Sequence, residues 1–321
     1  MRKSRNLYRI NQIAAQFYEK KFWGITAVGK RARLYMSKRG VSEKVCRSNN
    51  LGLAIRRGNS FYQKIKNKPI LLDLAFAVGL VVKKGDDIYD FYRDRIMIPI
   101  YDLDKHVVGF VGRSIDEGAR SKYINSLTSE IYSKGKCLFG IDKALDSPDS
   151  KKVLYMVEGI FDCFALQGMG KYNVVASNGT AVTKGHVLLM SRITNNVTLV
   201  FDGDKAGRNA MYKSLSLFLD RWISPKIVEL PEGKDPDSVF LGETGYLINE
   251  VLDELAVPLI DRYVQRVFSE HDDSTLKGRV KIVRNIAPML KYDLRVPGMY
   301  GNVKRVNDLL WGEGIKNIGG A

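Results

Sequence analysis

The sequence is poor in cysteine and histidine. Three of its 321 residues are cysteines and three are histidines. The cysteines, Cys46, Cys137 and Cys163, lie far apart and form no CxxC pair. This spacing argues against a disulfide framework and against a zinc site built within the chain, and it fits a reducing compartment. The histidines do not cluster with the cysteines, so we interpret them as surface or packing residues.

Long apolar segments are also missing. The longest run, PILLDLAFAVGLVV (69–82), contains Asp73. It is shorter than the roughly 20 residues that a membrane-spanning helix needs. The N-terminal stretch MRKSRNLYRINQIAAQFYEKK is basic, but it lacks the apolar core of a signal peptide. We therefore expect no membrane partner and a cytoplasmic location.

Acidic residues are scarce in the front half of the chain. Residues 1–150 hold 29 Lys or Arg against 15 Asp or Glu, whereas residues 151–321 hold 22 against 20. The net charge of +16 is therefore concentrated in the front half. Such a basic segment favours a polyanionic partner, and nucleic acid before a membrane surface.

The chain is long enough for two or three subdomains. Apolar residues recur at helical spacing in residues 6–22 and 27–39, and residues 61–83 predict further short helices. The stretch RIMIPIYDLDKHVVGFVGRSI predicts two strands joined by a turn at residues 102–105. The polar segment DSPDSKK (146–152) is a candidate boundary.

Strands and helices are predicted to alternate after this boundary. The predicted strands are KVLYMV (152–157), NVVAS (173–177), NVTLVF (196–201) and KIVEL (226–230). Helical patterns separate them, which predicts a parallel sheet covered by helices on both faces. From about Gly245 onward the sequence predicts a helical tail.

Acidic residues follow these strands. Ligands of open parallel sheets bind beyond the carboxyl ends of the strands. We expect six carboxylates at this edge: Glu158, Asp162, Asp202, Asp204, Asp235 and Asp237. Asp202 and Asp204 can point the same way at the two-residue period of an extended chain. Asp162 lies one helical turn after Glu158, so it can reach the same edge.

A hard divalent cation would compensate this crowded negative charge. Mg²⁺ prefers carboxylate oxygens and leaves positions for water and substrate phosphate. Two such ions can hold the attacking and leaving oxygens of a phosphoryl displacement, and Gly159 and Gly203 allow close approach. The alternatives are structural: Asp204 can cap the following helix, and Asp235-Pro-Asp237 can form a turn.

Four segments of the second half resemble a known family. They are VEGIFD (157–162), ASNGTAVT (176–183), VFDGDKAGR (200–208) and LPEGKDPDSV (230–239). In order, spacing and motif they resemble the Toprim domain of bacterial DnaG-type primases, more than type IA topoisomerases or gyrase-type enzymes. In the front half, residues 32–45, 89–115 and 121–144 resemble the primase segment that precedes Toprim.

The resemblance implies an α/β fold, α+β overall, in three parts. These are a mixed α/β basic N-terminal subdomain (1–147), a Toprim parallel-sheet catalytic subdomain (148–242) and a C-terminal helical subdomain (243–321). It also implies a DNA primase catalytic core, which makes short RNA primers on single-stranded DNA from ribonucleotide triphosphates. The implied cofactor is Mg²⁺, with Mn²⁺ as a substitute.

Residue roles follow by the same resemblance. Glu158, Asp202 and Asp204 match the catalytic and metal-binding acids, and Asp162, Asp235 and Asp237 support the metal site. We expect a further set of residues to bind the template and the incoming nucleotide: Arg93, Arg95, Arg113, Lys122, Tyr123, Asn125, Lys134, Thr180, Lys184 and Arg208.

The basic segment can also be interpreted from its residues alone. Basic side chains interleaved with tyrosines suit a single strand, because charges contact phosphates and rings stack on bases. The alternative is a solvated basic face above core tyrosines. Thr180 and Lys184 stand near a predicted helix start, where phosphates bind, although capping explains the neighbouring Thr183 equally well.

Two features depart from the family pattern. The chain lacks the cysteines of the family's zinc ribbon, so we expect no zinc here, and it leaves little room for a helicase-binding domain. We expect the zinc ribbon and the replicative helicase contact on missing segments or another chain, at the replication fork. The rival interpretations are a Toprim nuclease or topoisomerase-like enzyme, and a non-catalytic nucleic-acid-binding module with a structural acidic cluster.

Overall fold

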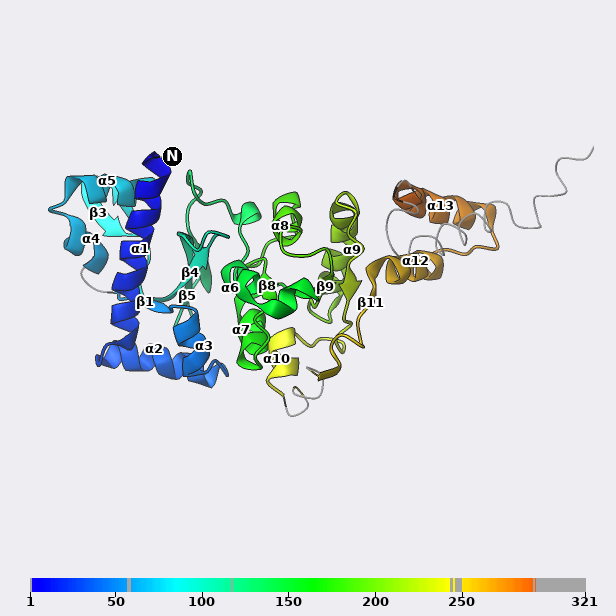
Figure 1. The fold of residues 1–321 in the computed structure, drawn as a ribbon, viewed down its shortest axis with the longest axis horizontal. Coiled ribbons are helices and arrows are strands. Elements are labelled where there is room, and N and C mark those ends of the chain that lie inside the picture. The colour runs from blue at the N-terminus through cyan, green and yellow to red at the C-terminus, as the bar shows by residue number, and fades with distance from the viewer. Residues whose placement is uncertain are drawn as a thin grey trace, which may run out of the picture. The chain divides into compact units, whose positions relative to one another are not determined.

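The computed structural model describes residues 2–56, 59–116, 118–242, 245, 250–290 and 292. The chain forms two compact units, coloured along the chain in Figure 1. The first unit comprises residues 1–147 and 159–180, and the second comprises residues 148–158 and 181–321. The three-part division expected from the sequence stays a prediction.

The first unit is built around a long N-terminal helix. Its helices are α1 (Arg2–Trp23), α2 (Ala27–Lys38), α3 (Glu43–Ser48), α4 (Ser60–Ile65), α5 (Pro69–Ala77), α6 (Ile141–Asp146) and α7 (Ile160–Gly168), with a 3₁₀ turn η1 (Lys134–Lys136). Helix α1 buries Leu7, Ile10, Ala14 and Tyr18 in one core cluster that also contains Phe110. This face has the helical spacing predicted from the sequence.

An antiparallel sheet packs within the same unit. Its strand order is β1-β4-β5-β6, with β1 (Gly52–Ala54), β4 (Arg95–Tyr101), β5 (Val107–Ser114) and β6 (Tyr123–Asn125). The predicted pair of strands is confirmed as β4 and β5. In the turn between them, the Asp102 Oδ1 atom accepts hydrogen bonds from the Asp104 and His106 backbone amides. Strand β8 (Val174–Ala176) also belongs to this unit and bridges to Phe139.

One prediction in this unit is partly wrong. The helical pattern expected through residue 83 ends with α5 at Ala77, and residues 81–84 form a strand. Strand β2 (Val81–Lys84) pairs with β3 (Asp87–Asp90) in a separate hairpin. The reason is local, because Gly79 adopts a φ of +72°, which ends a helix and which side-chain-bearing residues rarely adopt.

The second unit contains the predicted parallel strands. Within it the strand order is β11-β10-β9-β7, with β7 (Leu154–Val157), β9 (Val197–Leu199), β10 (Lys226–Ile227) and β11 (Val257–Pro258). Strands β7, β9 and β10 are parallel, and Leu154 is in register with Val197. The edge strand β11 is antiparallel and was not predicted; its Pro258 suits an edge because proline cannot donate to a neighbouring strand.

Helices complete the second unit. They are α8 (Lys184–Met190), α9 (Lys205–Leu219), α10 (Pro236–Phe240), α12 (Leu259–Glu270) and α13 (Leu276–Leu290), with a 3₁₀ turn η2 (Pro148–Lys151). The predicted helical tail is confirmed for α12 and α13, but residues 252–258 form a turn and the strand β11 instead. The rest of the predicted tail after α13 lies outside the described residues, apart from residue 292. No described helix is long and apolar enough to cross a membrane.

Candidate active site

Two neighbouring parallel strands bring the first acidic residues together in the second unit. Glu158 follows β7 directly, and Asp202 follows the extension of β9, where the Val200 amide donates to the Met156 carbonyl over 2.8 Å. The Asp202 backbone amide donates a hydrogen bond to the Glu158 carboxylate. The two acidic residues therefore meet at the carboxyl ends of the strands, as the parallel sheet predicts.

The loop after β10 packs against the loop that carries Asp202 and Asp204. The Gly203 amide donates to the Lys234 carbonyl over 2.8 Å. Arg208 spans both loops, since its guanidinium donates to the Gly203 carbonyl and pairs with Glu232 at 2.8 Å. A Cβ atom at Gly203 would lie only 2.2 Å from the Pro231 carbonyl oxygen, so only glycine permits this approach.

The resulting acidic rim is electrostatically coupled. Burial raises the pKa of Asp202, and the negative charges of Asp235, Asp204 and Asp237 raise it further. Burial also raises the pKa of Glu158, with Asp202 and Asp204 adding to the effect and the hydrogen bond from the Asp202 amide opposing it. Like charges disfavour ionisation when they share a site. The five carboxylates of the second unit therefore act on one another at this rim.

Some of these carboxylates also cap helices. The Asp204 Oδ1 atom accepts from the Gly207 amide at 2.8 Å, and the Asp235 Oδ1 atom accepts from the Ser238 amide at 3.1 Å. Burial acts to raise the pKa of Asp235, but hydrogen bonds from Ser238 outweigh it and lower the pKa overall. Asp204 and Asp235 therefore do cap helices, as the structural alternative expected. These caps are compatible with metal binding, because a carboxylate has two oxygens and several acceptor positions.

Asp162 belongs to the first unit. Its Oδ2 atom accepts from the Gly159 amide at 2.8 Å at the start of α7, and its side chain is buried. This contact is a helix cap of the kind that stabilises the first turn. Its expected support of a metal site stays a prediction.

A second group of possible metal-ligand atoms lies in the turn between β4 and β5 of the first unit. Within the described ranges, Asp102, Asp104 and His106 are the group whose candidate ligand atoms all lie within 4.8 Å of one another. The segment DLDKH (102–106) predicts only a turn from its sequence, so this cluster is a finding of the structure. The backbone hydrogen bonds to Asp102 explain its shape without a metal. The predicted acids do not meet that distance, so an ion would have to draw their side chains together.

The chemistry of the acidic rim nevertheless fits a divalent cation. Its donors are carboxylate oxygens, which hard cations prefer. Burial, followed by the charges of neighbouring carboxylates, raises the pKa values of Glu158 and Asp202, and a bound cation would favour their ionised forms. The residues best placed to hold it are Glu158, Asp202 and Asp204.

The first unit contains a cavity of about 280 Å³. Three residues predicted to bind nucleotide or template line it, namely Tyr123, Asn125 and Lys134. Burial lowers the pKa of Lys134, whose ammonium group donates to the Gly179 carbonyl at 3.4 Å. In the described part of the chain the buried Oδ1 atoms of Asn125 and Asn178 accept no hydrogen bond. Two of the cavity's lining asparagines therefore hold buried oxygens without a hydrogen-bond donor among the described residues, and Lys134 supplies a cation in the same lining.

Aromatic rings and guanidinium groups stack beside this cavity. Arg113 is only 6% exposed, donates to the Tyr35 hydroxyl over 2.9 Å, and lies 4.6 Å from the Tyr123 ring. Arg39 lies 4.5 Å over the Phe161 ring. Tyr123 remains 42% exposed, so its ring is supported from one side and accessible from the other. Tyr35, Arg39 and Phe161 are distant in sequence from Tyr123, so their proximity depends on tertiary packing and could not be predicted.

The other predicted nucleotide-binding residues fall into two groups. Arg95 is 9% exposed, and its guanidinium donates to the carbonyls of Gly112, Ser121 and Lys122, which supports the backbone that carries Lys122. Thr180 donates to the Ser177 carbonyl at 2.8 Å. The side chains that remain exposed are those of Arg93, Lys122 and Lys184. Their binding roles stay predictions.

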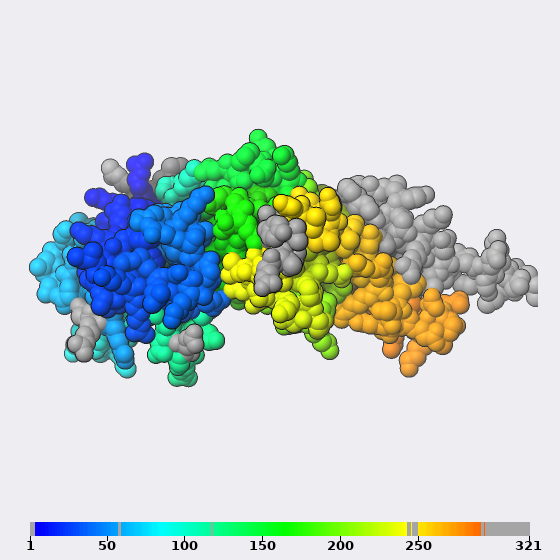
Figure 2. Space-filling model, turned by 90° about the horizontal axis from the view of Figure 1, so that it is seen from below, coloured from blue at the N-terminus to red at the C-terminus, as the bar shows by residue number. Residues whose placement is uncertain are grey.

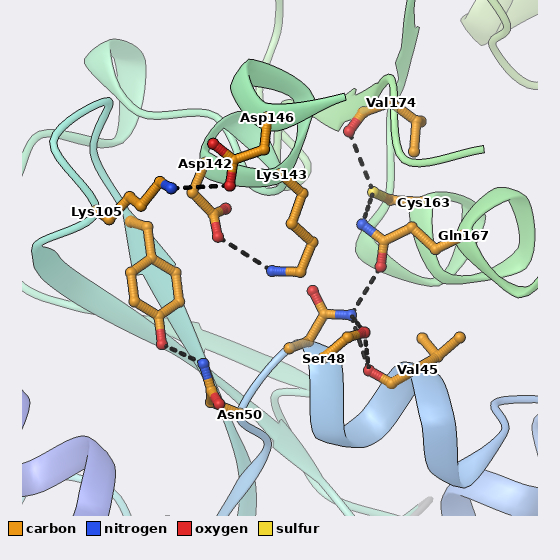
Figure 3. Close-up of polar contacts among 12 residues, drawn as sticks. Val45, Ser48, Asn50, Lys105, Asp142, Lys143, Asp146, Cys163, Gln167 and Val174 are labelled. Atoms are coloured by element: carbon orange, nitrogen blue, oxygen red, sulfur yellow. Dashed lines mark hydrogen bonds and ion pairs between the residues drawn. The ribbon is translucent and has the colours of Figure 1, made fainter. Parts of the chain in front are cut away.

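A buried hydrogen-bond relay holds α7 in the first unit (Figure 3). Asn49, which follows α3, donates to Gln167 at 2.7 Å, and Gln167 donates to the Cys163 sulfur at 3.4 Å. The Cys163 thiol in turn donates to the Val174 carbonyl at 3.7 Å. Burial strongly raises the pKa of Cys163. This cysteine is therefore an inert thiol that links α7 to β8.

Comparisons with known proteins agree with this geometry. The family model "DNA primase catalytic core, N-terminal domain" matches residues 17–145, and the model "Toprim-like" matches residues 155–240. A DNA primase of Clostridium acetobutylicum is 32% identical over 285 residues, which cover 89% of this chain and 47% of that protein.

Solved structures agree over nearly the whole chain. The structure of the DnaG catalytic core matches with a TM-score of 0.84 and 30% identity, over 95% of this chain and 97% of the other. The DnaG primase catalytic domain bound to ssDNA matches with a TM-score of 0.86 and 30% identity, over 96% and 97%. The chain spans 36–50% of the length of the first curated relatives that it matches. By sequence and fold together, this chain belongs to the family of bacterial DnaG-type primase catalytic cores.

Proposed function

We propose that this chain carries the catalytic core of a DNA primase, which synthesises short RNA primers on single-stranded DNA. One observation carries the proposal: Glu158, Asp202 and Asp204 follow neighbouring strands at one rim of a parallel sheet, where burial and the nearby negative charges raise the pKa values of Glu158 and Asp202. Such perturbed carboxylates are typical of functional sites. The catalytic-core relatives, one of them a complex with ssDNA, support the substrate class.

The proposed reaction is a nucleotidyl transfer. The 3′-hydroxyl of the growing primer attacks the α-phosphate of a ribonucleotide triphosphate, the new ester bond forms, and pyrophosphate leaves. Mg²⁺, with Mn²⁺ as a substitute, would neutralise the developing charge on the phosphate oxygens. Glu158, Asp202 and Asp204 would hold the ion, and Arg208 fixes the two loops that carry the aspartates.

The first unit would bind the polyanionic reactants. Lys134 offers a cation in a 280 Å³ cavity whose asparagine acceptors can receive hydrogen bonds from a nucleotide. Tyr123 presents an accessible ring with Arg113 behind it, an arrangement that suits base stacking. The proposed substrates are a single-stranded template and ribonucleotide triphosphates, with an RNA–DNA hybrid as product. A helicase and a zinc ribbon stay predictions for other segments or chains.

A primer-synthesis assay tests the proposal. The purified chain is incubated with single-stranded template, radiolabelled ribonucleotides and Mg²⁺, and products are resolved by size. We expect short RNA products with wild type, none with Asp202→Ala, and wild-type products with Glu254→Ala, which removes an exposed carboxylate outside the rim. Fluorescence anisotropy should show that Asp202→Ala still binds single-stranded DNA.

Two outcomes would contradict the proposal. Primers that persist in Asp202→Ala would show that the acidic rim is not the catalytic site. Degradation of the template without nucleotides would instead identify a Toprim-type nuclease with the same acidic residues.

A further inference from the structure

Helix α2 presents an apolar surface that no described residue covers. Leu34 is 56% exposed and Val28 is 41% exposed, and Ile25, just before the helix, is 91% exposed. The opposite side of the helix is buried through Gly29, Ala32 and Met36. Figure 2 shows α2, in blue, open on this face of the first unit. Exposed apolar groups gathered on one helix mark interaction sites more often than isolated ones do.

A hollow lies on each side of this helix. One has a volume of about 520 Å³, and its apolar lining comes from Ala27, Val28 and Ile55. The other has a volume of about 390 Å³ and is lined by Trp23 and Leu34, with Val41 and Cys46 beyond them. Both hollows lie within the first unit. We name the exposed side of α2, with Val28 and Leu34, and the two hollows beside it the α2 surface. This surface can accept apolar side chains from a partner.

The rim of the α2 surface is strongly basic. Between Lys20 and Arg47 the sequence contains nine Lys or Arg residues and one acidic residue, Glu43. Lys21, Arg31 and Arg56 line the larger hollow, and Arg33 lines the smaller one. The expected partner therefore combines acidic groups with apolar anchors, because both parts of the surface need a complement.

Details of the hollows favour a protein over a nucleic acid. Their exposed apolar groups are aliphatic, whereas single strands bind by stacking on aromatic rings. The one ring, that of Trp23, already has the Arg47 guanidinium at 3.8 Å and that of Arg33 at 5.9 Å.

We propose that the α2 surface docks an acidic, amphipathic peptide segment of a partner protein. Its apolar side chains enter the two hollows across Leu34 and Val28, and its carboxylates pair with Arg31 and Arg56, which are exposed at the larger hollow. This is helix-in-groove recognition, in which anchors at helical spacing bind an apolar groove. None of the residues that line its hollows belongs to the acidic rim or lines the cavity of Lys134.

Peptide binding with matched probes tests the proposal. The probe is a fluorescein-labelled peptide of about 16 residues, with leucines at i, i+3 and i+7 and glutamates between them. Its comparisons are the same peptide with serine for leucine, the same peptide with lysine for glutamate, and a single-stranded oligothymidine. Binding is measured by anisotropy with wild type, Leu34→Gln, Arg31→Gln and, as the matched control, Leu276→Gln, which changes an 80% exposed helical leucine of the second unit.

We expect the acidic, leucine-containing peptide to bind at least about tenfold more tightly than either altered peptide. Leu34→Gln and Arg31→Gln should each weaken it by about tenfold or more, with melting temperatures unchanged because both residues are exposed. Leu276→Gln should bind as wild type does.

Three results would overturn the proposal. Equal affinity for the serine peptide would show attraction by charge alone. If Leu34→Gln weakened the binding of the peptide and of oligothymidine by the same factor, the α2 surface would be a nucleic-acid-binding surface. Binding that neither α2 substitution alters, or that does not occur, would show that this surface docks no acidic peptide.

Discussion

Replacing Gly203 by alanine tests whether the acidic rim depends on close packing of two loops. The new Cβ atom would lie 2.2 Å from the Pro231 carbonyl oxygen and 2.8 Å from that of Leu230. Ordinary contacts begin near 3.4 Å, so the loops must separate by about 1.2 Å. Overpacking of this kind costs about 1–3 kcal/mol, and we expect the upper part of that range because the obstruction is backbone.

Calorimetry measures this change. A loss of 1 kcal/mol lowers the melting temperature by about 2–4 °C in units of 150–250 residues, so Gly203→Ala should melt roughly 4–12 °C lower. Separating the loops also moves Asp235 away from Asp202, so the increase in melting temperature caused by Mg²⁺ should shrink. The matched control is Gly168→Ala at the end of α7, where the added methyl meets no atom within 4 Å.

The control should be neutral or stabilised by up to about 1 kcal/mol, because alanine restricts the unfolded chain. The reasoning is refuted if Gly203→Ala melts with wild type and keeps its full response to Mg²⁺. In that case the Pro231 loop would not be fixed against the aspartates.

Two further substitutions follow from the same structure. Asp202 has a raised pKa, so its ionisation destabilises the folded state as the pH rises through that pKa. Without metal, Asp202→Asn should therefore have a higher melting temperature than wild type near pH 8. This difference in melting temperature should become smaller toward pH 4. A variant that melts lower at pH 8 in EDTA would contradict the repulsion. Gln167→Leu should reduce the free energy of unfolding by about 1–3 kcal/mol, since the buried Asn49 amide loses one of its hydrogen-bond acceptors and keeps only Val45 and Ser48. Denaturant unfolding that shows no loss would exclude the relay as a stabilising contact.

Much of the second unit could be predicted from local sequence. The alternation of strands and helices is confirmed, because buried parallel strands are short apolar runs and the helices between them have their own periodicity. The coupling of Glu158 with Asp202 and Asp204 follows from the same topology, since parallel strands end at one edge. Their roles in catalysis stay predictions.

Contacts between distant residues could not be predicted. The sequence of a strand does not show whether an arginine side chain contacts solvent or backbone. The Arg95 guanidinium is buried and donates to the carbonyls of Gly112 and Ser121, which its sequence context did not indicate. Asn178 lies beside the Asn125 cavity only because 159–180 folds within the first unit. The edge strand β11 has two residues, too few for a periodic pattern.

The path of the chain limits how this protein can be divided. The polypeptide leaves the first unit after residue 147, returns to it for residues 159–180, and leaves again. A fragment that begins at the linker would carry α7 without α3, so Phe161 would lose the guanidinium groups of Arg39 and Arg113, and Gln167 would lose its hydrogen bond from Asn49. The Toprim-like region therefore depends on residues 1–147 for part of its packing. Transferring this region to another protein requires transferring the rest of the first unit as well.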